Sequence, residues 1–573
     1  MIGRATGGMK KILNTENVVA YSVALLTFLV YMPALQNDFV NWDDDDYVYE
    51  NPSIQSFDIK LVRWAFFGFH AANWHPLTWI SHAADYAVWG LNPSGHHLTN
   101  IFLHAINTLV VVFLAMMLVD MFQKKSRRKK SSDFFPNENP KLVVGAVTGL
   151  LFGIHPLHVE SVAWIAERKD VLCALFFLLS VRSYLRFTIA EGNESPIQRN
   201  ILSSFLDRRY LCALGFFLLA VLSKPMAVTL PLVLLIVDWC PGGRIRSLRS
   251  LRYGIAEKVP FFVLSVFSSV LTLLAQSSGK AIMPLDIKPL SVRVIMSARA
   301  LVSYLSKMLF PVDLVPFYPY PKDVSLLYPE YLLPVLLVIV YTTVCIIVAK
   351  RQKLLLAVWS YYVITLLPVL GIIQVGAQSM ADRYTYLPSI GPFIVVGLGA
   401  GSLIEKVSSL SPSKQTAKVT FLIMGSIVIL FLSYESVKQL SIWKNSIVLW
   451  NYVVEKEPNE VTPAYYNLGL AYGRKGQTDK AIEDFSKALL INPKLDMAYN
   501  NRGTAYYLQG QYDKAFGDFS SAIKLNPNNA EAYINRGYVY LKKGDTASAA
   551  YDLQRGCHLG NERGCEALRD LLK

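Results

Sequence analysis

Apolar runs of similar length recur along the first 435 residues and are separated by short polar segments. Each run has roughly 17–22 residues, which is the length that an α-helix needs to cross the apolar core of a bilayer. We therefore expect about 11 transmembrane helices, at residues 17–36, 99–121, 141–157, 170–188, 210–223, 225–239, 259–277, 331–349, 354–373, 386–404 and 419–434.

One further apolar segment, residues 296–311, is harder to assign. It carries Arg299 and Lys307 and ends at Pro311. A crossing here would reverse the orientation of the helices that follow. We therefore expect a helix that lies in the membrane interface or re-enters the membrane, with a twelfth crossing as the alternative.

Residues 464–573 have a different pattern, because they are polar and they repeat. Related sequences begin at Ala464, Ala498 and Ala532, with the 34-residue period of tetratricopeptide repeats. Small residues recur where the two helices of a repeat would touch, at Gly469, Gly503, Gly537, Ala481, Ala515 and Ala549. We expect three repeats in an α-solenoid, whose concave groove binds an extended peptide or a partner helix. A stalk or a contact between copies of the chain is the alternative.

Composition and charge agree with a membrane protein and indicate its orientation. The chain is 53% hydrophobic and only 17% charged. Lysine and arginine are concentrated in the N-terminal tail and in alternate loops, including the run KKSRRKK at Lys124–Lys130. Positive loops stay in the cytoplasm. The N-terminus is then cytoplasmic, and an odd number of crossings places the repeats outside.

The six cysteines fall into two groups. Cys173, Cys212, Cys240 and Cys345 lie in or beside apolar runs and are interpreted as small core residues. The other two, Cys557 and Cys565, lie in the last repeat and its tail, on the side predicted to be outside. An oxidising compartment allows a disulfide between them.

Four consecutive aspartates, Asp43–Asp46, follow the first apolar run in the stretch NWDDDDYVYENP. They open a large outer loop, residues 37–98, with two amphipathic, aromatic-rich pieces that suit helices lying on the membrane. The aspartates form either a solvated acidic turn or a site that does chemistry at the membrane surface. A divalent cation held by Asp43 and Asp44 is a further hypothesis.

Other polar side chains are predicted on the same outer face, at the ends of later helices. They are His155, His158, Glu160, Glu167, Arg168, Lys169, Asp170, Lys224, Asp382, Arg383 and Tyr384. Cations hold phosphate, and a carboxylate can accept a proton from a hydroxyl nucleophile. This combination indicates an enzyme that uses a lipid-phosphate donor, whereas interfacial anchoring is the simpler explanation for the cations. The histidines show no closed zinc spacing.

Three stretches carry a resemblance to a known family: FVNWDDDDYVYENP, FGIHPLHVESVAWIAERKDVL and HPLTW with LNPSGHHLTNIFLHAIN. The chain resembles the transmembrane and tetratricopeptide-repeat O-mannosyltransferases and their bacterial relatives, which are GT-C class glycosyltransferases. The resemblance implies a polyprenyl-phosphate sugar donor and an acidic pair in the first outer loop, one member of which is the general base. That pair corresponds to Asp43 and Asp44, with Asp45 as a further candidate.

The same resemblance implies that basic residues hold the donor phosphate, here Arg168, Lys224 and Arg383, to which we add the neighbouring Lys169. His155, His158, Glu160, Asp382 and Tyr384 remain additional site candidates. In the eukaryotic relatives the repeats face the acceptor protein. Attack by a hydroxyl opposite the phosphate would invert the anomeric centre.

The sequence thus predicts an all-α polytopic membrane protein of GT-C type with three regions. These are a glycosyltransferase domain at 1–435, a connecting helix or degenerate repeat at 436–463, and the repeats at 464–573. We expect a bacterial inner-membrane enzyme with periplasmic repeats, an acceptor protein or peptide as partner, and no nucleic acid. The equivalent eukaryotic location is the endoplasmic reticulum membrane. Alternatives are a glycolipid or wall-polymer acceptor, a non-catalytic scaffold, and a transporter.

Overall fold

The computed structural model describes residues 14–128, 140–192, 197, 201–410, 414–457 and 461–573. The N-terminal tail and part of the basic run, Lys129 and Lys130, lie outside the described residues. The described chain forms two compact units. The first contains Met1–Asn37 and Asp44–Trp443, and the second contains Asp38–Asp43 and Lys444–Lys573.

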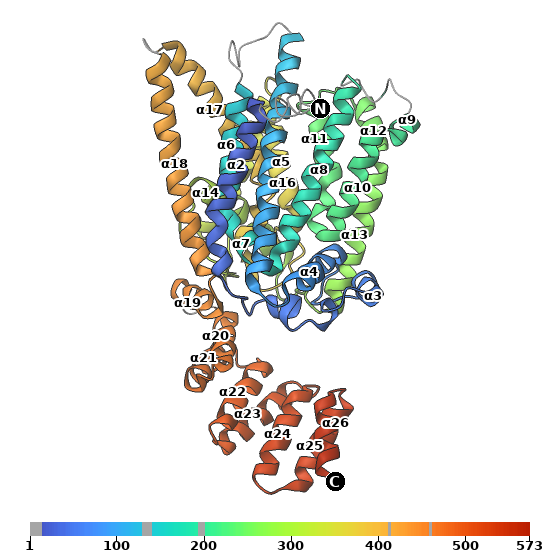
Figure 1. Cartoon of the computed structure of the whole chain (residues 1–573), viewed down its shortest axis with the longest axis vertical. Helices are drawn as coiled ribbons and strands as arrows, with labels where there is room; N and C mark the ends of the chain where they lie inside the picture. Colours follow the sequence, from blue (N-terminus) through green and yellow to red (C-terminus); the bar gives the residue numbers. More distant parts are fainter. Residues whose placement is uncertain (1–13, 129–139, 193–196, 198–200, 411–413, 458–460) are drawn as a thin grey trace, which may run out of the picture. The chain divides into compact units, whose positions relative to one another are not determined.

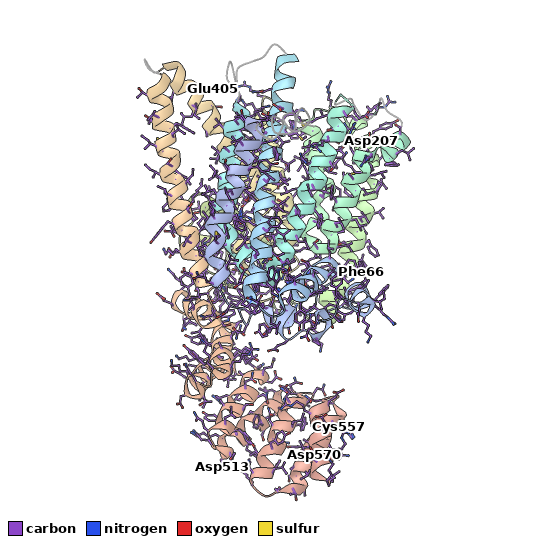
Figure 2. All side chains as sticks on the ribbon, viewed as in Figure 1. Phe66, Asp207, Glu405, Asp513, Cys557 and Asp570 are labelled. Atoms are coloured by element: carbon purple, nitrogen blue, oxygen red, sulfur yellow. A yellow bond between two sulfur atoms is a disulfide. The ribbon has the colours of Figure 1, made fainter. Side chains whose placement is uncertain are left out.

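The first unit is a bundle of long helices whose axes run side by side (Figure 1). Figure 2 shows Asp207 and Glu405 at one end of this bundle and Phe66 at the other. The bundle's long helices are α2 (Thr15–Tyr31), α5 (Pro93–Arg128), α6 (Pro140–Ile154), α8 (Arg168–Ala190), α10 (Arg208–Ser223), α13 (Val259–Ser278), α14 (Leu290–Leu309), α15 (Pro329–Val348), α17 (Ile390–Leu410) and α18 (Lys414–Ile442). Shorter helices are α7 (Val159–Ala163), α9 (Ile201–Leu206), α11 (Leu230–Trp239), α12 (Leu248–Glu257) and α16 (Leu354–Leu366).

Seven helices in the described part of the chain are long and apolar enough to cross a membrane, and an eighth crossing is made by α6 and α7 if that bent pair counts as one. By length and composition, seven or eight of the 11 predicted crossings are therefore long enough in the described part of the chain, and the protein is an all-α integral membrane protein as predicted. The three segments that fall short are α10, Pro225–Trp239 and Leu354–Val369. Helix α10 has 16 residues, a rise of about 24 Å against a bilayer core of about 30 Å. Prolines explain the other two, because Pro225 follows Lys224 at a helix break and Pro368 lies just beyond the end of α16.

Segment 296–311 belongs to α14, which carries Arg293, Arg299 and Lys307 and is not among the crossing candidates. Beyond it, two short strands pair antiparallel, β1 (Tyr318–Pro319) with β2 (Gln378–Met380). This pairing brings the loop after α14 to the loop before α17. The second of these loops continues from β2 into the turn Asp382–Thr385 (η9).

The predicted first outer loop folds against one end of the bundle. Its aspartates begin a π-helical turn, Asp45–Tyr49 (η2), and two helices follow, α3 (Ile59–Phe67) and α4 (Pro76–Trp89). Helices α3 and α4 lie across the end of the bundle instead of along it (Figure 1). The buried aromatic ring of Trp79 on α4 packs 4.5 Å from the ring of Tyr47, which fixes the turn to the helix.

The second unit contains the predicted repeats as three helix pairs. They are α20 (Thr462–Arg474) with α21 (Thr478–Ile491), α22 (Asp496–Leu508) with α23 (Tyr512–Leu525), and α24 (Ala530–Lys542) with α25 (Thr546–His558). Helix α19 (Ser446–Lys456) precedes them and α26 (Glu562–Leu571) follows. A Cβ atom added to Gly469 would lie 2.6 Å from the ring of Phe485, and one added to Gly503 would lie 2.9 Å from Phe519. The glycines therefore stand where the paired helices touch, as the pattern predicted.

Two of the three repeats contain the same internal ion pair. Arg502 binds both carboxylate oxygens of Asp518, and Arg536 does the same with Asp552. In the first repeat the corresponding acid, Asp484, is buried, but Leu468 occupies the position of the arginine. The predicted disulfide between Cys557 and Cys565 is present at the end of the third repeat (Figure 2).

The segment Asp38–Asp43 belongs to this second unit although it lies within the predicted outer loop, whose remainder belongs to the first unit. Its backbone at Asp38 donates to the carbonyl of Lys444 at 2.9 Å. The side chain of Asn41 donates to the carbonyl of Asn467 at 2.8 Å and accepts a hydrogen bond from the indole of Trp450 at 3.0 Å. The acidic run is thus divided between the two units. Asp43 ends the segment of the second unit, and Asp44 begins the segment Asp44–Trp443 of the first unit.

Candidate functional site

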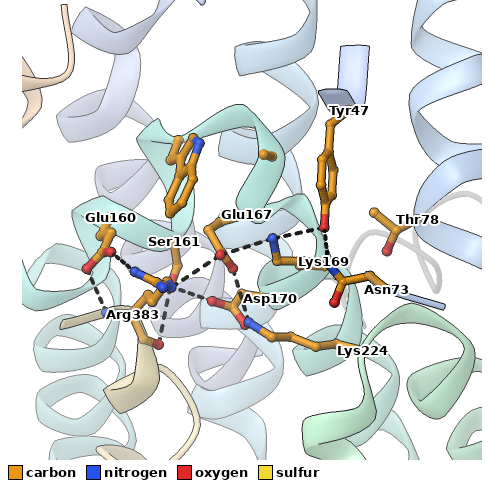
Figure 3. Close-up of polar contacts among 12 residues, drawn as sticks. Tyr47, Asn73, Thr78, Glu160, Ser161, Glu167, Lys169, Asp170, Lys224 and Arg383 are labelled. Carbon is orange, nitrogen blue, oxygen red and sulfur yellow. Dashed lines mark hydrogen bonds and ion pairs between the residues drawn. The ribbon is translucent and has the colours of Figure 1, made fainter. Parts of the chain in front are cut away.

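Six of the polar residues predicted on the outer face converge in the first unit and form one buried group of charges (Figure 3). These residues lie where helices begin or end. They come from α7, from the start of α8, from the turn before Pro225 and from η9. We call this group the site cluster; its members are Glu160, Glu167, Lys169, Asp170, Lys224 and Arg383. The structure therefore brings together residues that are more than 200 positions apart in the sequence.

The contacts within the site cluster are direct ion pairs. The ammonium of Lys224 lies 2.6 Å from Asp170 and 3.1 Å from Glu167. Glu167 also receives Lys169 at 3.1 Å and the Nε atom of Arg383 at 3.2 Å, so three cations share one carboxylate.

Arg383 extends the cluster to a second carboxylate, because it pairs with Glu160 through both its guanidinium and its backbone N–H. Ser161 donates to Asp170 at 3.2 Å. Three positive and three negative side chains are thus joined in one network.

The side chains of the three cations of the site cluster are slightly exposed to solvent. The exposed fractions of their side chains are 12% for Lys224, 8% for Lys169 and 7% for Arg383. Burial disfavours the charged ammonium of Lys224, but the carboxylates of Asp170 and Glu167 outweigh it and raise the pKa of Lys224 above its usual value. The pKa of Arg383 is also raised, so Lys224 and Arg383 carry the positive charge that phosphate binding requires.

The acidic run meets this region through Asp44. Its side chain is buried, and its Oδ1 atom accepts a hydrogen bond of 2.8 Å from the backbone N–H of Ala166. Ala166 directly precedes Glu167, so this bond fixes the carboxylate of Asp44 to the segment that carries the site cluster. Asp45 is half-buried and Asp46 is exposed, whereas Asp43 belongs to the second unit.

Two residues that the sequence analysis missed join the outer loop to the site cluster. The phenol of Tyr47 accepts from Lys169 at 3.4 Å and from the side-chain amide of Asn73 at 3.2 Å, and the ammonium of Lys169 lies 4.6 Å from the ring centroid of Tyr47 (Figure 3). The available signal was the position of Tyr47 directly after the four aspartates. Its role depends on a tertiary contact, which a single sequence does not reveal.

Arg168 lies beside Lys169 in the chain but is not part of the site cluster. It is fully buried and pairs with Asp85 at 2.5 Å. Its other guanidinium nitrogens donate to the side chain of Asn100 at 2.8 Å and to the carbonyl of His96 at 2.8 Å. These contacts use Arg168 to join α8 to α4 and α5, which differs from the predicted phosphate-binding role.

His155 and His158 have structural partners on both ring nitrogens. His155 bonds to the carbonyl of Met308 and accepts from the N–H of Leu157 at the start of a helical turn. His158 bonds to the carbonyl of Phe152 and to the hydroxyl of Ser389. Both rings therefore hold the bend between α6 and α7 in place, and neither joins the site cluster.

Asp382 and Tyr384 flank Arg383. The carboxylate of Asp382 accepts a hydrogen bond of 3.0 Å from the phenol of Tyr318, and burial raises the pKa of Asp382 to about 6. The guanidinium of Arg383 lies 4.9 Å from the ring centroid of Tyr384. Asp382 is therefore an acid that titrates close to neutral pH beside a permanent cation.

Within the residues that the structure describes, no three histidine, cysteine, aspartate or glutamate side chains are grouped so that they could hold a metal ion. A divalent cation at Asp43 and Asp44 remains a prediction.

A second buried group of charges lies about 20 Å further along α8, at 1.5 Å per residue. We call it the α12 cluster; it consists of Tyr184, Asp238, Arg244, Glu257 and Lys258. Arg244 contacts Asp238 at 2.9 Å and Glu257 at 2.8 Å. Lys258 contacts the same two carboxylates at 2.6 and 3.2 Å, and the phenol of Tyr184 lies 2.8 Å from both.

Known proteins resemble both the repeats and the membrane-spanning part of this chain. The family models described as "Tetratricopeptide repeat" and "TPR repeat" match residues 462–495 and 504–544. The human protein O-mannosyl-transferase TMTC1 is 25% identical over 81% of this chain and 54% of its own length. The Caenorhabditis elegans protein O-mannosyl-transferase F38B6.6 is 23% identical over 82% of this chain and 62% of its own length.

A shorter match is closer in sequence. The human protein O-mannosyl-transferase TMTC4 is 32% identical over 33% of this chain and 26% of its own length. The chain therefore spans between about a quarter and three-fifths of the length of these relatives. The predicted resemblance to the transmembrane and tetratricopeptide-repeat O-mannosyltransferases is confirmed.

Proposed function

We propose that the chain is an integral membrane glycosyltransferase that transfers a sugar from a polyprenyl-phosphate donor to a hydroxyl group of a protein. One observation carries the proposal: the bond from Ala166 to Asp44 fixes a carboxylate to the segment that supplies Glu167, Lys169 and Asp170. A proton acceptor and cations that could bind phosphate are thus connected through five consecutive residues, Ala166–Asp170. The relatives named protein O-mannosyl-transferase support the same reaction class.

In the proposed reaction, the acceptor hydroxyl oxygen bonds to the anomeric carbon while the bond from that carbon to the donor phosphate breaks. The electron pair of the broken bond stays on the phosphate oxygen. The proton of the hydroxyl passes to the carboxylate of Asp44. The phosphate is already a stable leaving group, so no strong acid is required, and attack from the opposite side inverts the anomeric centre.

Lys169, Lys224 and Arg383 would hold the donor phosphate. Each is a cation with some exposure, and each now contacts a carboxylate that a phosphate could replace as the partner. Arg168 is left out of this set, because its guanidinium is occupied by Asp85, Asn100 and a backbone carbonyl. Asp43 and Asp45 remain secondary candidates for the base.

The repeats would bind the acceptor, since stacked helix pairs present a groove suited to extended peptides. This role requires the repeats and the donor to be on the outer side of the membrane, which is the periplasm of a bacterial cell. In a chain without its native cysteines, a thiol reagent added from outside should label a cysteine at position 470 and not one at position 128. Labelling at 128 alone would reverse the proposed orientation.

The central experiment measures sugar transfer by the purified chain, with polyprenyl-phosphate-linked mannose as the first donor and mass spectrometry of exported proteins as the readout. Asp44→Asn keeps an oxygen that accepts from Ala166, so the fold should survive while the rate falls by about 10²–10⁴-fold. Asp46→Asn is the matched control, because Asp46 is exposed, and it should retain most of the activity.

Two results would contradict the proposal. Transfer at the normal rate after Asp43–Asp46 are all changed to asparagine would show that the run is only an acidic turn. Sugar found on a glycolipid or wall polymer, and on no protein, would remove the protein acceptor while leaving the glycosyl transfer in place.

A further inference from the structure

Helix α12 has one side that is packed firmly on the bundle. Its buried residues are Ser250, Gly254 and Glu257, and their spacing of four and three places them on one face of the helix. Glu257 is the only acid of the helix, and it pairs with Arg244 at 2.8 Å within the α12 cluster. This ion pair fixes the orientation of α12, so its remaining sides point away from the protein.

A second side of α12 is apolar and exposed. Leu248 is 77% exposed and Ile255 is 41% exposed. They are seven residues apart, which is two helical turns, so they lie on the same side. Helix α13, a candidate for crossing the membrane, follows directly and begins with the exposed Val259. These apolar side chains therefore stand at the boundary of a segment that faces the acyl chains.

A third side of α12 is cationic. Arg249 and Arg252 are three residues apart and exposed, and neither has a carboxylate partner among the residues that the structure describes. Helix α9 packs against α12, and the exposed Arg208 and Arg209 follow α9. Asp207, the acid beside them, accepts from the backbone N–H of Arg209 as the cap of α10. The result is a positive surface that attracts anions.

The two exposed sides together select the ligand. A free phosphate ion or a nucleic acid would satisfy the arginines and leave Leu248 and Ile255 in water. An anionic phospholipid offers a phosphate and acyl chains in one molecule, and guanidinium groups match the geometry of phosphate. A helix with separate apolar and basic faces lies in the plane of the membrane interface.

We propose that α12 lies in the headgroup layer of the membrane, with Leu248 and Ile255 among the acyl chains, and that Arg249 and Arg252 bind the phosphates of anionic phospholipids. Helix α12 is at the end of the bundle away from α3 and α4, where Figure 2 labels Asp207 (Figure 1). This lipid surface is thus separate from the site cluster, and the inference does not depend on the proposed reaction.

The test titrates phosphatidylglycerol into the purified full chain in neutral detergent, and native mass spectrometry measures the lipid bound to the intact protein. Arg249→Gln with Arg252→Gln should weaken binding by about 10–30-fold, because each cation near an anionic lipid contributes about fivefold. Lys494→Gln with Lys524→Gln removes the same charge from exposed positions in the repeats, and should change binding by less than about twofold.

A second variant tests the apolar side. Leu248→Gln keeps the net charge and should also weaken phosphatidylglycerol binding, because the contact with acyl chains is lost. Phosphatidylcholine should bind more weakly than phosphatidylglycerol, and equally to the wild type and the arginine variant. Inorganic phosphate and a short single-stranded RNA are added as competitors, and neither should displace the lipid at equal concentration.

The outcomes decide between the occupants. Equal binding by the wild type and the arginine variant, or equal losses in the arginine and lysine variants, would overturn the proposal. Displacement by inorganic phosphate, together with no effect of Leu248→Gln, would indicate a site for any phosphate, and displacement by RNA would indicate a nucleic-acid surface. If the double arginine variant does not fold, Arg249→Ala and Arg252→Ala are made singly, and each should weaken binding by about fivefold.

Discussion

The two ends of helix α8 carry buried charge clusters of similar composition and different accessibility. In the α12 cluster, the side chains of Arg244 and Lys258 are 2% and 0% exposed, and each contacts both carboxylates. In the site cluster, the exposed fraction rises to 12% at Lys224. Both clusters join several helices, but the cations of the site cluster are the more exposed.

The contrast shows that buried ion pairs alone do not identify a functional site. Such pairs often serve structure, because removing one member leaves a charge without compensation in a medium of low polarity. The distinguishing features are partial exposure and a neighbouring acid whose pKa is raised toward neutral pH. The site cluster has partial exposure at Lys224, and burial raises the pKa of the adjoining Asp382 to about 6. In the α12 cluster, Arg244 and Lys258 are at most 2% exposed, and the pKa of Glu257 is lowered to about 2.

The largest expected effect on stability is in the α12 cluster. Arg244→Gln leaves Asp238 and Glu257 with one cation instead of two, and should lower the free energy of unfolding by about 3–5 kcal/mol. Transfer activity per folded molecule should not change. Thermal unfolding in detergent gives the stability, and the exposed Arg246→Gln is the control. Loss of transfer activity in Arg244→Gln molecules that remain folded would show that the α12 cluster also takes part in transfer.

The next effect concerns donor binding at the site cluster. Lys224→Gln removes a charged contact to phosphate, which is equivalent to about 1.5–3 kcal/mol, or roughly 10–100-fold weaker donor binding. The measurement is the donor concentration at half-maximal transfer. Lys258→Gln, its counterpart in the α12 cluster, should lower stability without changing that concentration. The comparison fails if both variants shift donor binding to the same extent.

A smaller effect separates the two clusters by pH. Asp382 has a pKa of about 6 in the folded protein, above the ordinary aspartate value, so its ionisation destabilises the fold above pH 6 and the penalty is relieved as the pH falls through 6. Asp382→Asn should therefore be more stable than the wild type at pH 7.5, by on the order of 2 kcal/mol, and the advantage should shrink at pH 5.

Glu257 gives the control with the opposite sign. Burial opposes its ionisation, but Lys258 and Arg244 outweigh that effect and lower the pKa of Glu257 to about 2. Its charge therefore stabilises the fold above its ordinary pKa, and that stability is lost only as the pH falls toward 2. Glu257→Gln should be less stable than the wild type equally at pH 5 and 7.5. An Asp382→Asn advantage that does not depend on pH would contradict the assignment.

The smallest effect repeats the contrast inside the repeats. Asp518 has an arginine partner, whereas in the first repeat a leucine, Leu468, stands at the position of that arginine, and burial raises the pKa of Asp484 to about 6. Asp484→Asn should stabilise the first repeat by on the order of 1 kcal/mol at pH 7.5 and by less at pH 5. Asp518→Asn should destabilise the second repeat. Hydrogen exchange of peptides from α21 and α23 in the full chain measures both, and slower exchange in neither or both would refute the contrast.

The sequence predicted the repeats better than the site, for physical reasons. The helix contacts at Gly469 and Gly503 depend on local spacing within one repeat, which a periodic pattern records directly. The site depends on where helices stop. Lys169 and Arg168 are neighbours on α8 but point to different partners, and nothing in the sequence distinguishes their directions. Tyr47 and Asn73 were missed as site residues because their relation to Lys169 exists only after the outer loop folds back on the bundle.

The boundary between the two units falls inside the acidic run. Residues Asp38–Asp43 are hydrogen-bonded within the repeat unit, and the next residue, Asp44, accepts from Ala166 within the bundle. Neighbouring aspartates therefore report on different units. A substitution at Asp43 alters the repeat unit, whereas the same substitution at Asp44 alters the bundle and the carboxylate proposed as the base.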